Sequence, residues 1–211
     1  MALDELFLRR AIVTGSALVY WAGVWFQARR VRRRIGRSPN LKPRGAKERV
    51  LWVGWMLVVA AWLAQPFVAG GASSLFAWRL WPAFLHPAVF VAGLGLVLAG
   101  YAGTIWCYAA MGDAWRIGVN RKELTALVAV GPYRFVRHPI YVFQIVMLAG
   151  ALLLLPTALS LFILLLHFGC VRIKAADEES YLLGQHPEGY GNYLQSTGRL
   201  LPRFRRSSRI P

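Results

Sequence analysis

Two polar clusters flank a long apolar stretch of this chain, and both contain residue types that bind charged ligands. The first cluster is Arg137-His138-Pro139-Ile140-Tyr141, and the second is Lys174 followed by Asp177-Glu178-Glu179. No Asp, Glu, Lys or Arg occurs in the stretch 140–171 between them. If this stretch folds back on itself in a bilayer, both clusters reach the same membrane face. Cationic, aromatic and carboxylate side chains would then meet at one site.

The charges within the clusters predict a site for a zwitterionic ligand. Pro139 suits the first turn of a helix, where its missing N–H is no loss. His138 is then the N-cap, at a helix terminus that attracts anions. Arg137 adds a cation that grips a carboxylate with two bonds. Lys174 and Glu178 are four residues apart and share one helix face. In the alternative interpretation, Arg137 and Glu178 pair with each other and hold the apolar hairpin closed.

The composition indicates a membrane protein. Of 211 residues, 57% are hydrophobic and 16% are charged, whereas soluble domains have about 25% charged residues. The apolar residues occur in four blocks, residues 11–26, 50–69, 85–110 and 140–171. A transmembrane helix needs about 20 residues, so each of the first three blocks predicts one span. The fourth is too long for one span, and Pro156 near its middle can break a helix. We therefore predict a tight hairpin of two helices, 139–155 and 157–173; one long kinked helix is the alternative.

The basic residues predict the topology. The formal net charge is +16, and ten of the 25 Lys and Arg residues lie in 29–49, five in 116–137 and seven in 172–209. Positively charged loops face the cytoplasm, and only five spans place all three segments there. The expected fold is therefore an all-α integral membrane protein with five transmembrane helices, the N-terminus outside and the C-terminus cytosolic. The charges follow the membrane boundaries, where they attract anionic headgroups. This distribution argues against a nucleic-acid-binding protein.

The chain divides into two predicted units. Residues 1–111 would form three N-terminal spans with an irregular basic cytosolic loop, 29–49. Residues 112–211 would form a core made of a cytosolic loop, the hairpin 139–173, a cytosolic helix and a tail. That helix is expected to continue to about Leu183, with Gly184 as its C-cap. A series of small residues predicts close helix packing in the third span: Gly93, Gly95, Ala99, Gly100 and Gly103.

Neither a metal site nor a cleaved leader is expected. Cys107 and Cys170 fall in or near spans, and two thiols are too few for a structural zinc site. The first ten residues lack a basic leader with a small-residue cleavage site, so we expect no signal peptide.

The R-H-P-x-Y segment 137–141, the long apolar stretch and Glu178-Glu179 together resemble the isoprenylcysteine carboxyl methyltransferase family and its phospholipid N-methyltransferase relatives. The Gly131-Pro132-Tyr133 lead-in and a tail with Tyr190, Tyr193 and Leu201-Pro202 extend the resemblance over residues 115–204. The resemblance implies an integral membrane methyltransferase that uses S-adenosyl-L-methionine without a Rossmann domain. Its active site would face the cytosol, at the inner membrane of a bacterium or the endoplasmic reticulum of a eukaryote.

The same resemblance implies roles for individual residues. Cofactor contacts would come from Thr125, Ala126, Leu127, Val128, Tyr133, His138, Pro139, Ile140, Tyr141 and Glu178. Lys174 falls where the family commonly has a substrate-facing arginine, and lysine lacks the planar fork of arginine. Phe143 replaces a small residue and would narrow the lipid entrance. We assign catalysis to Glu178, Lys174 and Arg137.

The expected substrate is a lipid or lipidated small molecule, methylated at a carboxylate. A carboxylate is already ionised at pH 7, whereas an amine needs a base such as Glu178 or Tyr141. Three alternatives stay open. The first is a phospholipid or amine N-methyltransferase. The second is an NADPH-dependent sterol-type reductase, which has a similar R-H-P-x-Y segment but an acidic residue where this chain has Gln144. The third is a membrane partner protein without activity. Membrane lipids are expected partners, and the oligomeric state is not indicated.

Overall fold

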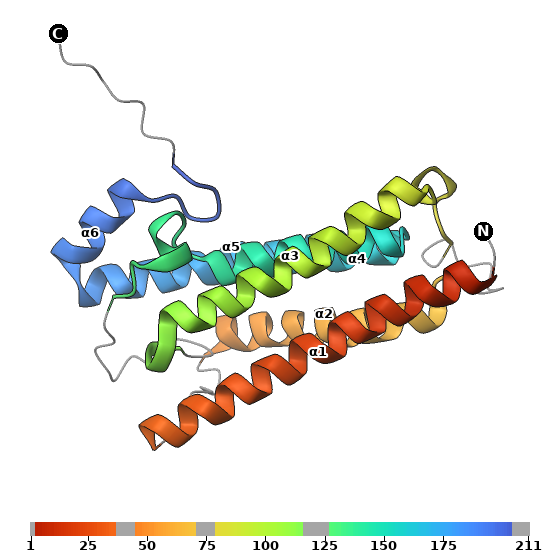
Figure 1. Cartoon of the computed structure of the whole chain (residues 1–211). Helices are drawn as coiled ribbons and strands as arrows, with labels where there is room; N and C mark the ends of the chain where they lie inside the picture. The colour runs from red at the N-terminus through yellow and green to blue at the C-terminus, as the bar shows by residue number, and fades with distance from the viewer. Residues whose placement is uncertain (1–2, 37–44, 71–78, 116–126, 204–211) are drawn as a thin grey trace, which may run out of the picture.

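The described part of the chain is built from helices. A computed structural model describes residues 3–36, 45–70, 79–115 and 127–203 (Figure 1). Its helices are α1 (Leu3–Ile35), α2 (Ala46–Val68), α3 (Pro87–Met111), α4 (Pro139–Leu154), α5 (Ala158–Gln185) and α6 (Pro187–Ser196). Three short 3-10 turns are η2 (Pro82–Phe84), η3 (Gly112–Ala114) and η4 (Gly131–Arg134). Within these residues no strand forms apart from one isolated bridge, so the all-α class is confirmed.

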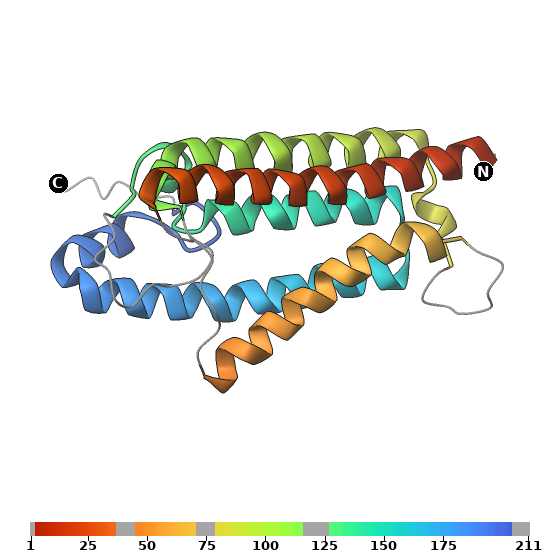
Figure 2. The ribbon, with the colours of Figure 1, turned by 90° about the horizontal axis from the view of Figure 1, so that it is seen from below.

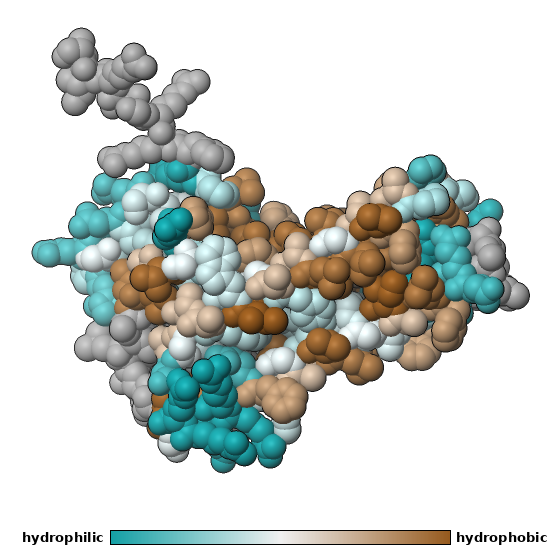
Figure 3. Space-filling model, viewed as in Figure 1, coloured by the Kyte–Doolittle hydropathy of each residue, from teal (hydrophilic) through white to brown (hydrophobic). Residues whose placement is uncertain are grey.

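Four helices are long and apolar enough to cross a membrane, namely α1, α2, α3 and α5. Helix α4 has 16 residues and is therefore about 24 Å long, against a hydrocarbon core of about 30 Å. The chain is an integral membrane protein, and the count of five spans stays a prediction. Figure 3 shows hydrophobic residues across the middle of the visible face and hydrophilic residues at the ends.

The chain reverses at Pro156. Helix α4 ends at Leu154 and α5 begins at Ala158, each within one residue of the predicted bounds. Thr157 caps α5 by accepting the Ser160 N–H at 3.1 Å. Arg9 of α1 is fully buried and donates to the Leu154 carbonyl at 3.1 Å, which satisfies the end of α4. The two helices then run side by side in opposite directions (Figures 1 and 2).

Helices α3 and α4 pack through glycines. A Cβ on Gly100 would lie 2.8 Å from the Phe143 carbonyl oxygen, and one on Gly150 would lie 2.6 Å from the Gly93 carbonyl oxygen. Only residues without a side chain allow this approach. Of the predicted small residues, Gly93, Gly100 and Gly103 face α4, whereas Gly95 and Ala99 are exposed.

Helix α2 packs antiparallel on α5. Lys47 Nζ lies 2.6 Å from Asp177 Oδ1 near one end, and the Ser160 hydroxyl donates to Gln65 Oε1 at 2.7 Å near the other. Figure 2 shows that α1 and α2 converge at the end nearer the N-terminus and diverge at the opposite end. The start of α4 and the end of α5 lie at that opposite end (Figure 1).

Two sequence expectations are wrong in detail. The run Arg29–Arg34 was expected in an irregular loop, but it is the last part of α1. Cations at a helix C-terminus compensate the helix dipole, so the helix continues through them to Ile35; residues 37–44 lie outside the described part. Gly184 is inside α5 rather than its C-cap, because the helix ends at Gln185. Pro187 then starts α6 at its first position, where proline is tolerated.

Candidate functional site

The site begins with the turn that precedes α4. Gly131 has a φ of 59°, a left-handed conformation that favours glycine. Pro132 follows at the start of η4, and the turn buries Tyr133. The Tyr133 carbonyl accepts a hydrogen bond from the Tyr193 hydroxyl of α6. Burial raises the pKa of the Tyr133 hydroxyl, which therefore stays protonated and able to donate.

The C-terminal tail fixes the entry to α4. The backbone N–H of Arg137 donates to the Gly198 carbonyl at 2.9 Å, and that of His138 donates to the Arg199 carbonyl at 3.2 Å. His138 is the N-cap of α4, as predicted. The tail therefore lies directly against the R-H-P-x-Y segment.

Residues from both polar clusters meet at the start of α4. The Tyr141 hydroxyl donates to Glu178 Oε1 at 2.9 Å. His138 Nδ1 lies 3.4 Å from Glu178 Oε2. The rings of His138 and Tyr141 stack, with centroids 5.7 Å apart and planes 15° apart. The structure therefore joins His138, Tyr141 and Glu178 into one hydrogen-bonding cluster.

Glu179 is the centre of a second network. Its carboxylate accepts from Arg137 Nε at 2.8 Å and from Arg199 Nη2 at 2.5 Å. Arg137 also donates to the carbonyls of Leu194 and Thr197. The alternative pairing of Arg137 with Glu178 is wrong, because consecutive helix residues point about 100° apart. Arg137 ties α5 to the tail through Glu179 instead.

His138 lies between the two carboxylates. Its Nε2 is 3.3 Å from Glu179 Oε1, opposite the contact with Glu178. Burial disfavours the charged imidazole, but the hydrogen bonds and charges of Glu178 and Glu179 outweigh it and raise the pKa of His138. The imidazole is therefore held as a cation to higher pH than a free histidine.

The remaining predicted residues are placed as follows. Lys174 is buried, one helical turn before Glu178, and no ion pair joins it to another residue in the described ranges. Pro139 is buried and Ile140 half-buried at the start of α4. Val128 is half-buried, and Leu127 lines a hollow of about 420 Å³ beside His186, Pro187 and Glu188. Thr125 and Ala126 lie outside the described residues.

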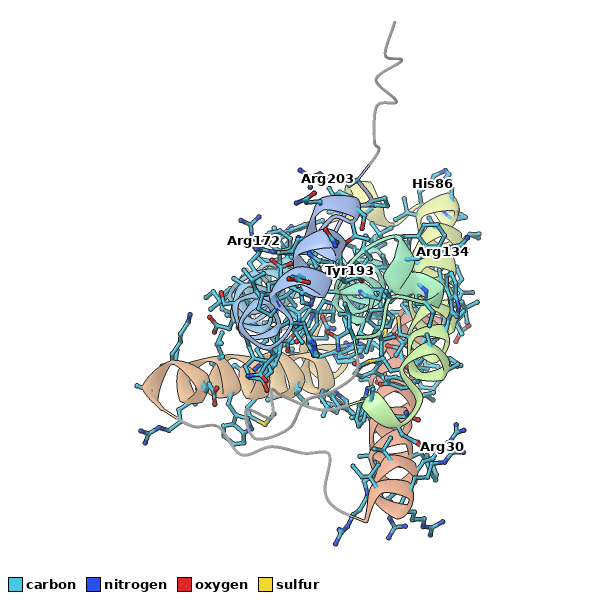
Figure 4. The ribbon with its side chains drawn as sticks, turned by 90° about the vertical axis from the view of Figure 1, so that its left-hand side faces the viewer. Arg30, His86, Arg134, Arg172, Tyr193 and Arg203 are labelled. Carbon is cyan, nitrogen blue, oxygen red and sulfur yellow. The ribbon has the colours of Figure 1, made fainter. Side chains whose placement is uncertain are left out.

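Basic side chains surround this end of the molecule. Figure 4 views the molecule from that end: Tyr193 lies near the centre, and Arg30, Arg134, Arg172 and Arg203 lie around the rim. This arrangement agrees with a face that contacts anionic headgroups.

Two residues of the site were not identified from the sequence. Arg199 is 20 residues from its partner Glu179, and no local pattern connects them. Trp55 of α2 lies against Tyr141, with ring centroids 6.1 Å apart. Its position on α2 carried no signal because tryptophan is common near membrane interfaces.

The donors and acceptors of this cluster fit S-adenosylmethionine. Glu178 has a side chain that is 21% exposed, so its carboxylate is available to ammonium or hydroxyl groups. The N–H groups of Ile140 and Tyr141, at the start of α4, have no helical carbonyl to bond and suit a carboxylate. Lys174 adds a cation one helical turn before Glu178, and this cation suits an anionic group of a ligand.

Comparison with known sequences finds a family match over part of the chain. The isoprenylcysteine carboxyl methyltransferase (ICMT) family matches residues 93–184, so the resemblance is confirmed for that stretch. The match begins earlier than predicted, within α3, and ends before the tail. The resemblance of the tail residues Tyr190, Tyr193 and Leu201-Pro202 stays a prediction.

A curated relative gives a weaker match. This chain is 25% identical over 121 residues to the nickel-cobalt-cadmium resistance protein NccN of Alcaligenes xylosoxydans xylosoxydans. The match covers 57% of this chain and 53% of that protein, so this chain spans about half of the relative's length.

Proposed function

We propose that this chain, whose residues 93–184 match the ICMT family, is an S-adenosylmethionine-dependent methyltransferase of the membrane that methylates the carboxylate of a lipid or lipidated small molecule. The observation that carries the proposal is the hydrogen bond from Tyr141 to Glu178, at 2.9 Å. It joins the two motifs that the family resemblance depends on. The active site is proposed to face the cytosol, at the basic end of the molecule.

The chain's residues would act mainly by positioning. S-adenosylmethionine, when bound, supplies an electrophilic methyl group on a sulfonium. Tyr141 orients the Glu178 carboxylate, which attracts the cationic and hydroxyl groups of the cofactor. The N–H groups at the start of α4 suit its carboxylate. Such positioning accounts for most of the acceleration expected in an in-line displacement.

The acceptor carboxylate would be held by Lys174. Lys174 as a whole residue is 9% exposed, and a cation in such a buried position is stabilised by an anion close by. Because a carboxylate is ionised at pH 7, the acceptor needs no base. Arg137 is occupied by Glu179 and two backbone carbonyls. We therefore propose that it positions α5 against the tail rather than binding the cofactor.

The alternatives have less support. An amine acceptor would need a base and would not pair with Lys174. A sterol-type reductase would have an acidic residue three positions after Tyr141. This chain has Gln144 there, and its side chain donates a hydrogen bond to the Tyr20 hydroxyl. The name of the bacterial relative concerns metals, but in the described ranges no three His, Cys, Asp or Glu side chains are grouped to hold one. We propose no metal function.

Calorimetric titration tests the proposal on protein purified in detergent. We expect the wild type to bind S-adenosylmethionine and not NADPH. Glu178→Gln should lose at least about tenfold in affinity, as for a lost charge-assisted hydrogen bond. Asp177→Asn is the matched control, because this neighbouring carboxylate pairs with Lys47 instead, and its affinity should be unchanged.

A second assay identifies the acceptor atom. Lipid extract is incubated with protein and radiolabelled S-adenosylmethionine. A product whose label is released by mild base is a methyl ester and supports a carboxylate acceptor. A base-stable product would instead support N-methylation. Binding of NADPH alone would contradict the methyltransferase proposal.

A further inference from the structure

Five side chains form an aromatic seam where α1, α2 and α4 meet next to the candidate site. They are Tyr20 of α1, Trp55 and Trp62 of α2, and Tyr141 and Gln144 of α4. Trp55 contacts Tyr141 at a centroid distance of 6.1 Å, and Trp62 contacts Tyr20 at 5.7 Å. Gln144 donates a hydrogen bond to the Tyr20 hydroxyl and connects the two pairs.

The seam contains polar atoms without partners. Trp62 is only 4% exposed, and its Nε1, the Nε1 of Trp55 and the Oε1 of Gln144 are buried without a hydrogen bond among the described residues. A buried polar group without a partner costs about 1–3 kcal/mol. Within a bilayer no bulk water is available to satisfy it. These atoms therefore call for a ligand that forms hydrogen bonds.

The type of atom restricts the chemistry of that ligand. An indole N–H can only donate, so the ligand must present acceptors to Trp55 and Trp62, and a protonated amine has none. Gln144 Oε1 is itself an acceptor, so it would pair with a donor on the ligand, such as a hydroxyl. Trp55 and Trp62 are seven residues apart on α2, which corresponds to about 10 Å along the helix. The ligand must therefore carry acceptors at two depths, one beside Tyr141 and one deeper.

The arrangement of helices agrees with a ligand from the bilayer. Helix α2 packs on α5 through Lys47 and Gln65 and diverges from α1 toward the end that carries the site (Figure 2). Between α2 and α4, aromatic rings rather than close-packed backbones make the contact. A flat or flexible apolar chain suits such a surface.

We propose that the aromatic seam binds the methyl acceptor, and that this acceptor is an oxygenated lipid with a carboxylate head and a second oxygen about 10 Å along its chain. The carboxylate oxygen accepts from Trp55 beside the Tyr141–Glu178 pair. The chain oxygen, as a hydroxyl, ether or carbonyl, accepts from Trp62. This inference rests on the proposed function. Three of its five residues, Tyr20, Trp55 and Trp62, lie before the stretch 93–184 that matches the family.

Lipid binding without cofactor tests the seam. Protein in nanodiscs is titrated with stearic acid, a mid-chain hydroxystearic acid and octadecylamine. We expect both acids to bind and the amine to bind at least about tenfold more weakly. The hydroxyl should improve affinity about two- to tenfold, the gain of one hydrogen bond.

Conservative variants assign the donors. Trp62→Phe keeps the ring and should abolish the gain from the hydroxyl while stearic acid binds unchanged. Trp55→Phe should weaken both acids equally. Trp52→Phe, on the exposed side of α2 at 52% exposure, is the control and should change neither.

The outcomes separate this inference from the proposed function. If Trp62→Phe keeps the hydroxyl gain, or if the amine binds as tightly as the acids, the seam does not bind an oxygenated acceptor. Titration of the same preparations with S-adenosylmethionine then tests the proposed function separately. If the wild type binds S-adenosylmethionine but shows no preference among the lipids, only this inference is overturned. If the wild type does not bind S-adenosylmethionine, the proposed function is overturned.

Discussion

His138 lies between Glu178 and Glu179, and this placement makes the stability of the protein depend on pH. The raised pKa of His138 means that the folded protein holds the proton more tightly than the unfolded chain. The stabilisation is complete below the ordinary pKa of about 6.5 and is lost as pH rises through the raised folded value.

A substitution at His138 should reveal this dependence. We expect His138→Gln to lower the melting temperature by a few degrees at about pH 5.5. The difference from wild type should shrink at about pH 8.5 or above. Thermal unfolding in detergent at both values measures it. A difference that does not change with pH would mean that His138 stabilises the fold without its charge.

Glu179 and Arg199 contribute unequally to the same network. The side chain of Glu179 is 8% exposed and that of Arg199 is 38% exposed. Glu179→Ala leaves Arg137 without its carboxylate partner, and we expect a loss of about 3 kcal/mol, as for a broken buried ion pair. Arg199→Ala should lose at most about 1 kcal/mol. Chemical denaturation in detergent compares the two, and equal losses would contradict the central position of Glu179.

At the residue scale, the sequence predicted which side chains form the site better than it predicted which of them pair with each other. Pro139 indicated the helix start, and His138 is the cap as a result. The partner of Arg137 was not predictable, because Glu178 and Glu179 differ only by a rotation about α5. In the structure Glu179 faces the tail, where Arg199 also donates to it.

At the scale of elements, α4 packs closely against α3 because glycines at the contact have no side chain. An added Cβ at Gly100 would meet the Phe143 carbonyl oxygen at 2.8 Å, a backbone atom that cannot move alone. Gly95 lies on the same helix with open space around its Cβ position. The two glycines therefore provide a matched pair.

We expect opposite effects of alanine at these positions. Gly100→Ala should cost about 2 kcal/mol through overpacking and weaken cofactor binding, since α4 carries His138 and Tyr141. Gly95→Ala should be neutral or gain up to about 1 kcal/mol from helix propensity. Melting temperature and S-adenosylmethionine titration of both variants test this. A tolerated Gly100→Ala would mean that the α3–α4 distance does not control the site.

Helix positions were predictable from hydropathy, and their ends less so. Pro156 identified the break between α4 and α5 because it removes a donor within an apolar stretch. The extension of α1 through Arg29–Arg34 was missed, since a basic run after a span reads equally well as loop or helix. Gly184 was misassigned because glycine at a C-cap is only a tendency, and α5 continues one residue beyond it to Gln185.

At the scale of the whole molecule, the topology depends on whether α4 crosses the bilayer. Helix α4 is shorter than a usual span, yet it and α5 connect the two ends of the molecule (Figure 1). With five spans, the end of α1 and the start of α6 lie on the same side of the membrane. With only the four candidate spans α1, α2, α3 and α5, they lie on opposite sides. Charge favours five spans, because the basic segments then share the cytoplasm.

Cysteine labelling decides between the two arrangements. In a background with Cys107→Ser and Cys170→Ser, single cysteines replace Arg30, Phe84 and Glu188, which lie in or beside α1, η2 and α6. A membrane-impermeant maleimide added to intact cells should label Phe84→Cys. With five spans, Arg30→Cys and Glu188→Cys both face the cytosol, on the same side as the site. The reagent should therefore label them only after permeabilisation. Labelling of Glu188→Cys in intact cells, with Arg30→Cys still protected, would mean that α4 does not cross. The start of α4 and the end of α5 would then lie on opposite membrane faces, so His138 and Glu178 could not form one site.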